Sequence, residues 1–226
     1  MPGIPNSGQH QPPRTPRADG EATRQRILRA AGQLFAERGY AETTSKAICA
    51  LAQSNLAAVN YHFGSREGLY RPLLRDMHRY LISYDQLERL TRSTLAPRDK
   101  LAGLIDALTL NVTQGERWQA RLWARELLSP SPFLSELIDQ EAVPKVRLVL
   151  SLLSEITGIP AQDPALLRCL LSVMAPYLML QVVNREIPSP LTGIFEQTAE
   201  ELAQHLKTFA LAGLEAVALE HRKGTL

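Results

Sequence analysis

The chain has few cysteines and no apolar run long enough to span a membrane. Its 226 residues include 2 cysteines, Cys49 and Cys169, which lie far apart and have no histidine at metal-ligand spacing. We therefore expect neither a disulfide framework nor a metal site. The longest apolar run, residues 166–183, falls short of the ~20 residues that a membrane-spanning helix needs and is interrupted by Arg168 and Pro176. We therefore expect no membrane partner.

The sequence also lacks a secretory signal and the usual motifs of catalysis. The first 20 residues contain five prolines and no apolar stretch, so we expect a disordered tail over residues 1–20 and a protein of the reducing cytoplasm. After residue 90 there is no glycine-rich phosphate loop, no metal-ligand cluster and no nucleophile with an attendant base. These absences predict no cofactor and no enzymatic activity. An enzyme whose site is assembled from distant residues is the least favoured alternative.

The charge is unevenly distributed along the chain. Residues 1–80 contain 11 lysines and arginines against 6 acidic residues, whereas residues 81–226 contain 14 against 17. A basic N-terminal segment on a nearly neutral body is typical of a small nucleic-acid-binding module carried by another domain. The alternative is a chance distribution of solvated charge.

From Glu21 onward the apolar residues recur at helical spacing, and no stretch alternates as a strand would. Thr43 or Thr44 can cap the second helix, Asn55 can cap the third, and Ser65 can cap the fourth, because their side-chain oxygens accept unpaired backbone N–H groups. The first helix should stop at Gly39. The fold is therefore predicted to be all-α, with helices near residues 21–38, 44–52, 56–62, 66–90, 97–114, 116–128, 132–157, 164–185 and 192–221. Pro144 and Pro176 should kink the helices that contain them.

The second and third helices are separated by a short break, which is the pattern of a helix-turn-helix whose third helix enters the DNA major groove. The string from Gly39 to Tyr70, GYAETTSKAICALAQSNLAAVNYHFGSREGLY, resembles the signature of the TetR family of bacterial repressors. The residues that carry this resemblance are Gly39, Tyr40, Thr43, Thr44, Ile48, Ala52, Tyr61, His62, Phe63, Ser65, Arg66, Glu67 and Leu69. It covers residues 21–75. It implies a three-helix DNA-binding domain over residues 21–66 and a helical ligand-sensing and dimerisation domain over residues 67–226.

The chain departs from the family pattern at two places. Gln53-Ser54-Asn55 stands where the family commonly has Gly-Val-Ser, and a left-handed backbone there would cost ~1 kcal/mol without glycine. Asn60 occupies a position that is often tyrosine in the family and binds phosphate, so we expect Tyr61 or His62 to take that role. For His62, the alternative is a histidine favoured by the helix dipole at a C-terminus.

Several side chains around the turn have the chemistry to contact DNA. Lys46 and Arg66 are long enough to reach phosphates or base edges, although a solvated surface position is the alternative for both. Ala57 would allow close approach of the backbone, and Asn55 or Asn60 can pair with adenine. The predicted DNA-binding residues are Thr44, Ser45, Lys46, Asn55, Leu56, Ala57, Asn60, Tyr61, His62 and Arg66.

The resemblance also implies a homodimer that pairs through the last two long helices. Each of these helices carries an apolar stripe that fits this role, although packing within the chain is the alternative. The stripe of the helix near 164–185 comprises Leu166, Leu170, Val173, Met174, Tyr177, Leu178 and Gln181. That of the helix near 192–221 comprises Leu202, Leu206, Phe209, Gly213, Leu214 and Val217.

Residues 118–133, WQARLWARELLSPSPF, are similar to the Arg-Glu followed by Pro of a TetR subgroup with CecR-like C-terminal domains. The predicted ligand-binding residues are Trp118, Arg121, Trp123, Phe133 and Met174, with plain core packing as the alternative. The sequence thus predicts a repressor that a small-molecule effector releases from a near-palindromic double-stranded DNA operator. A DNA-binding regulator without an inducer is the alternative.

Overall fold

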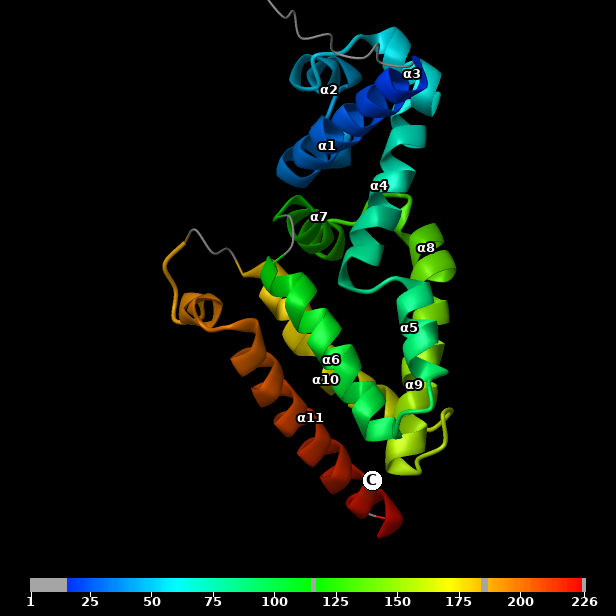
Figure 1. Cartoon of the computed structure of the whole chain (residues 1–226), viewed down its shortest axis with the longest axis vertical. Helices are drawn as coiled ribbons and strands as arrows, with labels where there is room; N and C mark the ends of the chain where they lie inside the picture. Colours follow the sequence, from blue (N-terminus) through cyan, green and yellow to red (C-terminus); the bar gives the residue numbers. More distant parts are fainter. Residues whose placement is uncertain (1–15, 115–116, 184–186, 225–226) are drawn as a thin grey trace, which may run out of the picture.

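The computed structural model describes residues 16–114, 117–183 and 187–224, and within these ranges the chain forms helices and no strand (Figure 1). At one end lie α1 (Pro16–Glu42), α2 (Ser45–Leu51), α3 (Leu56–Phe63) and the start of α4 (Arg66–Leu81), which we call the head. The other end, which we call the body, is built from α5 (Tyr84–Thr91), α6 (Pro97–Gln114), α9 (Val143–Thr157), α10 (Pro164–Val182) and α11 (Ala199–Arg222). Between them lie α7 (Arg117–Leu128), α8 (Leu134–Leu137) and a π-helical turn, η1 (Ile138–Ala142).

The helices of the head begin at the predicted caps. The side-chain oxygens of Thr44, Asn55 and Ser65 each accept the backbone N–H of the third residue that follows. Thr43, the other residue predicted as a possible cap of α2, is buried, and its hydroxyl donates to the carbonyl oxygen of Gly39 at 2.8 Å. Gly39 itself has φ 81°, which ends the regular part of α1 at the predicted position.

Four predicted helices differ from the structure, two by an internal break and two at their first residue. The helix expected over 66–90 breaks at Ile82, which is extended, because Ser83 forms a capping box with Gln86 that starts α5. The helix expected over 132–157 is interrupted by η1, and Pro144 lies in the first turn of α9, where its missing N–H is tolerated.

At the C-terminal end, the helix expected from residue 192 starts at Ala199, after the 3₁₀ turn η2 (Thr192–Glu196), because Thr198 and Glu201 form another capping box. Residues 16–20 of the predicted tail belong to α1, because the helix starts at Pro16 rather than near residue 21; residues 1–15 lie outside the described residues.

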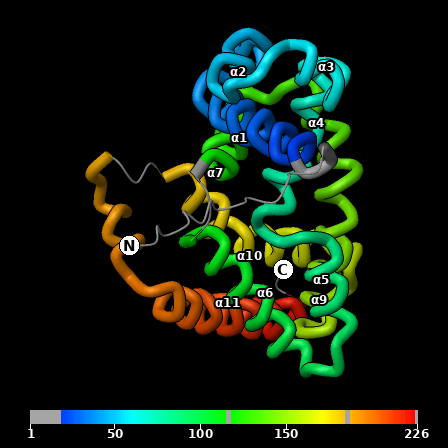
Figure 2. The backbone as a smooth tube through the Cα atoms, turned by 45° about the horizontal axis from the view of Figure 1, so that its top comes forward, coloured from blue at the N-terminus to red at the C-terminus, as the bar shows by residue number. Residues whose placement is uncertain are grey.

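The molecule has two apolar cores. The core of the head extends past the expected domain boundary at residue 66, because the buried face of α4 and two residues from α7 and α8 complete it; its members include Ile27, Phe35, Ile48, Val59, Leu69, Tyr70, Leu73, Met77, Leu122 and Leu137. The core of the body includes Leu87, Leu101, Leu108, Val149, Leu153, Leu166, Val173, Tyr177 and Leu214. Helix α7 packs against α1, α4 and α10, and therefore joins the two cores (Figure 2).

By length and composition alone α10 is long and apolar enough to cross a membrane, so the expectation that no apolar run reaches that length was wrong. Leu166, Cys169, Val173 and Tyr177 of this helix are nevertheless buried in the body core, and α10 packs against α6, α7, α9 and α11. The core helix of a protein meets the same length and composition test, and the packing of α10 is of that kind.

Candidate DNA-binding surface and effector site

Helix α3 has one exposed face and one buried face. Leu56, Ala57, Asn60 and Tyr61 are exposed at spacings of one and four residues, which places them on the same side of the helix, whereas Val59 lies in the head core. Tyr61 is 86% exposed, which leaves its hydroxyl accessible. The exposed face thus offers an amide, a phenol and short apolar groups without a carboxylate, so nothing on it repels DNA phosphates. Amides can pair with adenine, and apolar groups can contact the methyl group of thymine.

The start of α2 comes shortly before α3 in the sequence and adds one positive charge, that of Lys46. Lys46 is exposed in the first turn of α2, next to the half-buried Ser45. The hydroxyl of Thr44 accepts the backbone N–H of Ala47 at 3.2 Å, and the side-chain oxygen of Asn55 accepts that of Ala58 at 2.8 Å. These two predicted DNA-binding residues therefore hold helix ends with their oxygens, and Asn55 keeps its amide N–H groups for other contacts.

Arg66 does not join the exposed face. Its Nη1 donates to the carbonyl oxygen of Thr43 at 2.8 Å, and its guanidinium lies 4.3 Å from the ring centre of Tyr40. These contacts tie the start of α4 to the segment before α2. His62 is half-buried at the end of α3, with its ring edge-on to that of Tyr61 at 5.0 Å. Both residues thus have contacts within the head.

The turn between α2 and α3 uses a left-handed residue that is not glycine. Gln53 has φ 49°, and it is the one non-glycine residue with positive φ in the ranges 16–114, 117–183 and 187–224. The N–H of Ser54 then donates to the carbonyl oxygen of Cys49 at 2.9 Å, which closes the turn. The turn therefore carries the strain expected from the absence of glycine at this position.

Helices α2 and α3 are joined by this turn, α3 has an exposed face, and both are carried on a larger helical body. This arrangement defines a helix-turn-helix DNA-binding protein. The family model described as bacterial regulatory proteins, tetR family, matches residues 27–73. A second, described as the C-terminal domain of the HTH-type transcriptional dual regulator CecR, matches residues 97–217, more than half of the chain. The chain belongs to the TetR family of transcriptional regulators, with a C-terminal domain of the CecR type.

Individual relatives agree with this assignment. The HTH-type transcriptional repressor NicS of Pseudomonas putida is 34% identical over 86 residues, which is 38% of this chain and 39% of the length of that relative. A TetR-like transcriptional regulator from Rhodococcus sp. RHA1 has a TM-score of 0.61 and 21% identity, over 89% of this chain and 98% of the other. GusR of Salmonella enterica has a TM-score of 0.56 and 21% identity, over 90% and 97%. The two solved structures show that the fold is shared.

The five predicted ligand-binding residues do not converge on one cavity. Trp118 lies so close to Gly32 of α1 that a Cβ atom on this glycine would be 2.9 Å from the indole. Phe133 packs edge-on against the ring of Tyr40 at 5.0 Å in the head core. Met174 packs against the body core instead, and Arg121 is exposed on α7. Packing within the chain thus occupies Trp118, Phe133 and Met174.

Trp123 differs from these residues because its indole nitrogen is buried without a hydrogen-bond partner. Among the described residues, Oε1 of Gln119, one turn earlier on α7, and Oε1 of Gln181 on α10 are likewise buried without a partner, whereas the hydroxyl of Tyr177, one turn before Gln181, faces the side chain of Thr109. Helices α7 and α10 pack together, and we call these four residues, two on each helix, the α7–α10 seam; the ring of Trp123 also lies edge-on to that of His78 on α4, with 5.7 Å between the ring centres. The sequence contained a signal for it, since Gln181 is a polar residue within an apolar stripe.

Lys145 and Glu141 are buried where the η1–α9 segment meets α4. The ammonium group of Lys145 lies 2.9 Å from Nδ1 of His78 and donates to its carbonyl oxygen at 3.3 Å, while Arg79 pairs with Glu141 at 2.8 Å. Burial, and secondly the charge of Lys145, lower the pKa of His78 to about 4. Burial also lowers the pKa of Lys145 to about 8, against the opposing effect of Glu141. These contacts hold the C-terminal half of α4 against η1 and α9.

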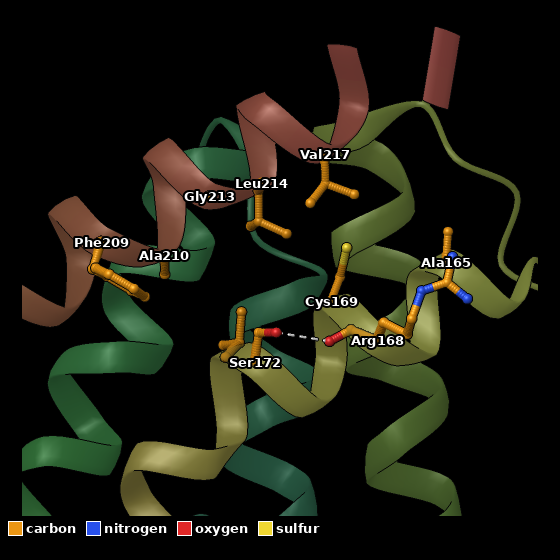
Figure 3. Close-up of a pocket in the computed structure, with 10 residues that line it drawn as sticks. Ala165, Arg168, Cys169, Ser172, Phe209, Ala210, Gly213, Leu214 and Val217 are labelled. Atoms are coloured by element: carbon orange, nitrogen blue, oxygen red, sulfur yellow. Dashed lines mark hydrogen bonds between the residues drawn. The ribbon is translucent and has the colours of Figure 1, made fainter. Parts of the chain in front are cut away.

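Helices α10 and α11 enclose a hollow of about 210 Å³ that opens to the surface (Figure 3). Cys169 of α10 and Val217 of α11 line it, and Phe209 lies at its edge in Figure 3. Large apolar side chains are exposed on the same two helices, namely Leu167, Leu171, Met179, Val182, Phe209 and Leu219. The stripes predicted from the sequence face inward at Leu166, Val173, Tyr177, Gln181, Leu202 and Leu214, whereas Phe209 and Gly213 of the second stripe are exposed.

Proposed function

We propose that the protein is a homodimeric transcriptional repressor of the cytoplasm that binds a near-palindromic operator and is released by a small-molecule effector. The exposed face of α3 is the observation that carries the DNA-binding part, because it offers base-reading side chains on a helix held firmly by the head core. The relative NicS is named a repressor, which favours repression over activation. We propose no catalytic role, in keeping with a family of transcriptional regulators.

Within this function, Asn60 reads adenine and Leu56 and Ala57 contact thymine methyl groups, while Lys46 and Tyr61 bind phosphates. The test is selection of binding sites from a randomised duplex library with the purified chain, which should enrich an inverted repeat rich in A·T pairs. Asn60→Ala should then lose ~1–3 kcal/mol of discrimination at one position of each half-site. Gln33→Ala, an exposed polar residue of α1, is the matched control and should bind as the wild type does. Failure to enrich any site would contradict the proposal.

Pairing of two copies is assigned to the exposed apolar residues of α10 and α11, because such a patch favours association in water. Leu171 is 65% exposed, so Leu171→Glu leaves the chain core intact and should give a monomer. Leu128→Glu on α7, where the side chain is 79% exposed, is the control that should remain dimeric. Sedimentation should show twice the 25.1 kDa chain mass for the wild type and the control.

The effector is assigned to the α7–α10 seam. A buried polar atom without a partner costs about 1–3 kcal/mol, so a ligand with complementary groups gains by pairing with it. The seam offers one N–H donor, two amide oxygens and a hydroxyl and no charged side chain, which favours an uncharged ligand with both donors and acceptors. Of the predicted ligand-binding residues, this assignment keeps Trp123 and leaves out Trp118, Arg121, Phe133 and Met174. It adds Gln119, Tyr177 and Gln181.

The effector proposal is tested with uncharged aromatic amides and phenols, compared with hydrocarbons of the same shape. The amides and phenols should quench or shift tryptophan fluorescence and weaken operator binding, and Gln181→Leu should abolish both responses. A regulator without an inducer is the second candidate, and it would be favoured if no compound altered operator affinity.

A further inference from the structure

Arg125, near the end of α7, reaches into the head. Its Nε donates to the carbonyl oxygen of Ala36 at 3.2 Å, and its Nη2 donates to that of Glu37 at 2.6 Å. These carbonyls belong to the last regular turn of α1 before Gly39, where a helix leaves its carbonyl groups without intrahelical partners. The side chain also fits closely against Gly39, since a Cβ atom there would lie 3.2 Å from Nη1 of Arg125. Arg125 is thus a cap for α1 supplied by another element.

The next residue, Glu126, binds the other long helix of the head. Glu126 is 2% exposed, and its Oε1 accepts a hydrogen bond from the hydroxyl of Tyr70 on α4 at 2.6 Å. The second oxygen accepts the backbone N–H of Ser131 at 3.1 Å and its hydroxyl at 2.9 Å. Burial and the neighbouring carboxylate raise the pKa of Tyr70, which therefore stays a hydrogen-bond donor. We call Arg125, Glu126 and Tyr70 the α7 latch.

The latch holds both helices that flank the helix-turn-helix. Helices α1 and α4 each pack on α3, so the two contacts of the latch fix the orientation of α3 relative to α7. Helix α7 in turn packs on α10, one of the helices proposed to form the dimer interface. The directional hydrogen bonds of a guanidinium and a carboxylate specify an angle between elements more narrowly than apolar packing does. Such a contact is suited to setting the direction in which each head leaves the dimer.

We propose that Arg125 and Glu126 are positioning residues for DNA recognition, which fix the separation and rotation of the two heads and so set the half-site spacing that the dimer accepts. This inference rests on the proposed dimeric repressor. Changing the operator by one base pair rotates one half-site by about a tenth of a turn, because B-DNA has 10–10.5 base pairs per turn. A rigid pair of heads should detect that change, and a loosened pair should tolerate it.

The experiment uses the full chain and the operator selected from the random library, in its original form and with one base pair added to or removed from the centre. The variants are Arg125→Met, which keeps the length of the side chain but removes its donors, and Tyr70→Phe, which removes one hydroxyl. Arg125→Lys is the conservative variant. Arg147→Met, an exposed arginine of α9, is the matched control.

The wild type and Arg147→Met should lose at least about tenfold in affinity when the spacing changes by one base pair. Arg125→Met and Tyr70→Phe should lose less than about threefold, and Arg125→Lys should recover part of the preference. All variants should bind a duplex with a single half-site as the wild type does, because α3 is unchanged. A role in stability alone would lower single-site binding and leave the spacing preference in place.

Wild-type spacing dependence in both Tyr70→Phe and Arg125→Met would overturn this inference and leave the proposed repressor intact. If Arg125→Met does not fold, Tyr70→Phe and Arg125→Lys carry the same comparison. Absence of any spacing preference in the wild type would instead contradict the proposed function, together with the role of the latch.

Discussion

The left-handed Gln53 predicts that a single glycine stabilises the helix-turn-helix. An L-residue with a side chain in this conformation costs ~1–2 kcal/mol, and glycine avoids that cost but gives up ~0.5–1 kcal/mol through the greater entropy of the unfolded chain. The side chain of Gln53 is exposed, so little packing is lost with it. Gln53→Gly should therefore raise the free energy of unfolding by ~0.5–1 kcal/mol.

Urea denaturation at one fixed protein concentration measures this difference, because dimerisation makes stability depend on concentration. The midpoint should rise without a change in the slope of the transition. Ser54→Gly is the matched control, since Ser54 has no positive φ and glycine there should destabilise the protein. Equal or lower stability of Gln53→Gly would refute the argument that this turn is strained.

Three further predictions follow from the same structure. Lys46→Ala should weaken binding to all DNA sequences and lower the slope of log affinity against log salt by ~0.9 per lost phosphate contact, as measured by titration at several salt concentrations; an unchanged slope would remove Lys46 from the interface. Because the pKa of His78 is lowered from 6.5 to about 4, the unfolded chain takes up the proton first, and the free energy of unfolding should fall by about 2 kcal/mol from above pH 6.5 to pH 5. His78→Gln should lack this part of the acid loss in urea titrations at the two pH values. Gly64→Ala should cost at least ~1–2 kcal/mol in the same assay, because φ 73° with ψ −48° lies outside even the left-handed helical region, and an added Cβ atom meets no neighbour within 4 Å, so backbone strain alone is measured.

The sequence predicted the head well because its determinants are local. Thr44, Asn55 and Ser65 cap helices through groups three residues away, and the exposed side of α3 follows from helical periodicity. The break at Ser83 was missed because apolar spacing continues through Ile82, and a capping box competes with that pattern. The contact between Arg66 and the carbonyl oxygen of Thr43 was not predicted, because that carbonyl lies 23 positions earlier in the chain.

The proposed effector site could not be predicted in the same way, because contacts with distant helices decide which side chains of α7 are already packed within the chain. The indole of Trp118 packs against Gly32 of α1. The indole N–H of Trp123, only five positions later, has no hydrogen-bond partner among the described residues. The most continuous apolar stripe of α10 packs in the core of the body rather than on the proposed dimer surface. The exposed stripe is interrupted by polar residues and includes Leu167 and Leu171.

The magnitudes at the seam are sufficient for the proposed release from DNA. A hundredfold loss of operator affinity requires ~2.7 kcal/mol of coupling between effector and DNA. Each unpaired polar atom that a ligand satisfies contributes about 1–3 kcal/mol, so two of the unpaired atoms of Gln119, Trp123 and Gln181 are enough if they are satisfied better in the released state. Gln119 and Trp123 lie on the same helix as Arg125 and Glu126, so a shift of α7 toward a ligand would act on both α1 and α4. Loss of inducer response in the latch variants, with ligand affinity retained, would be the expected consequence of this arrangement.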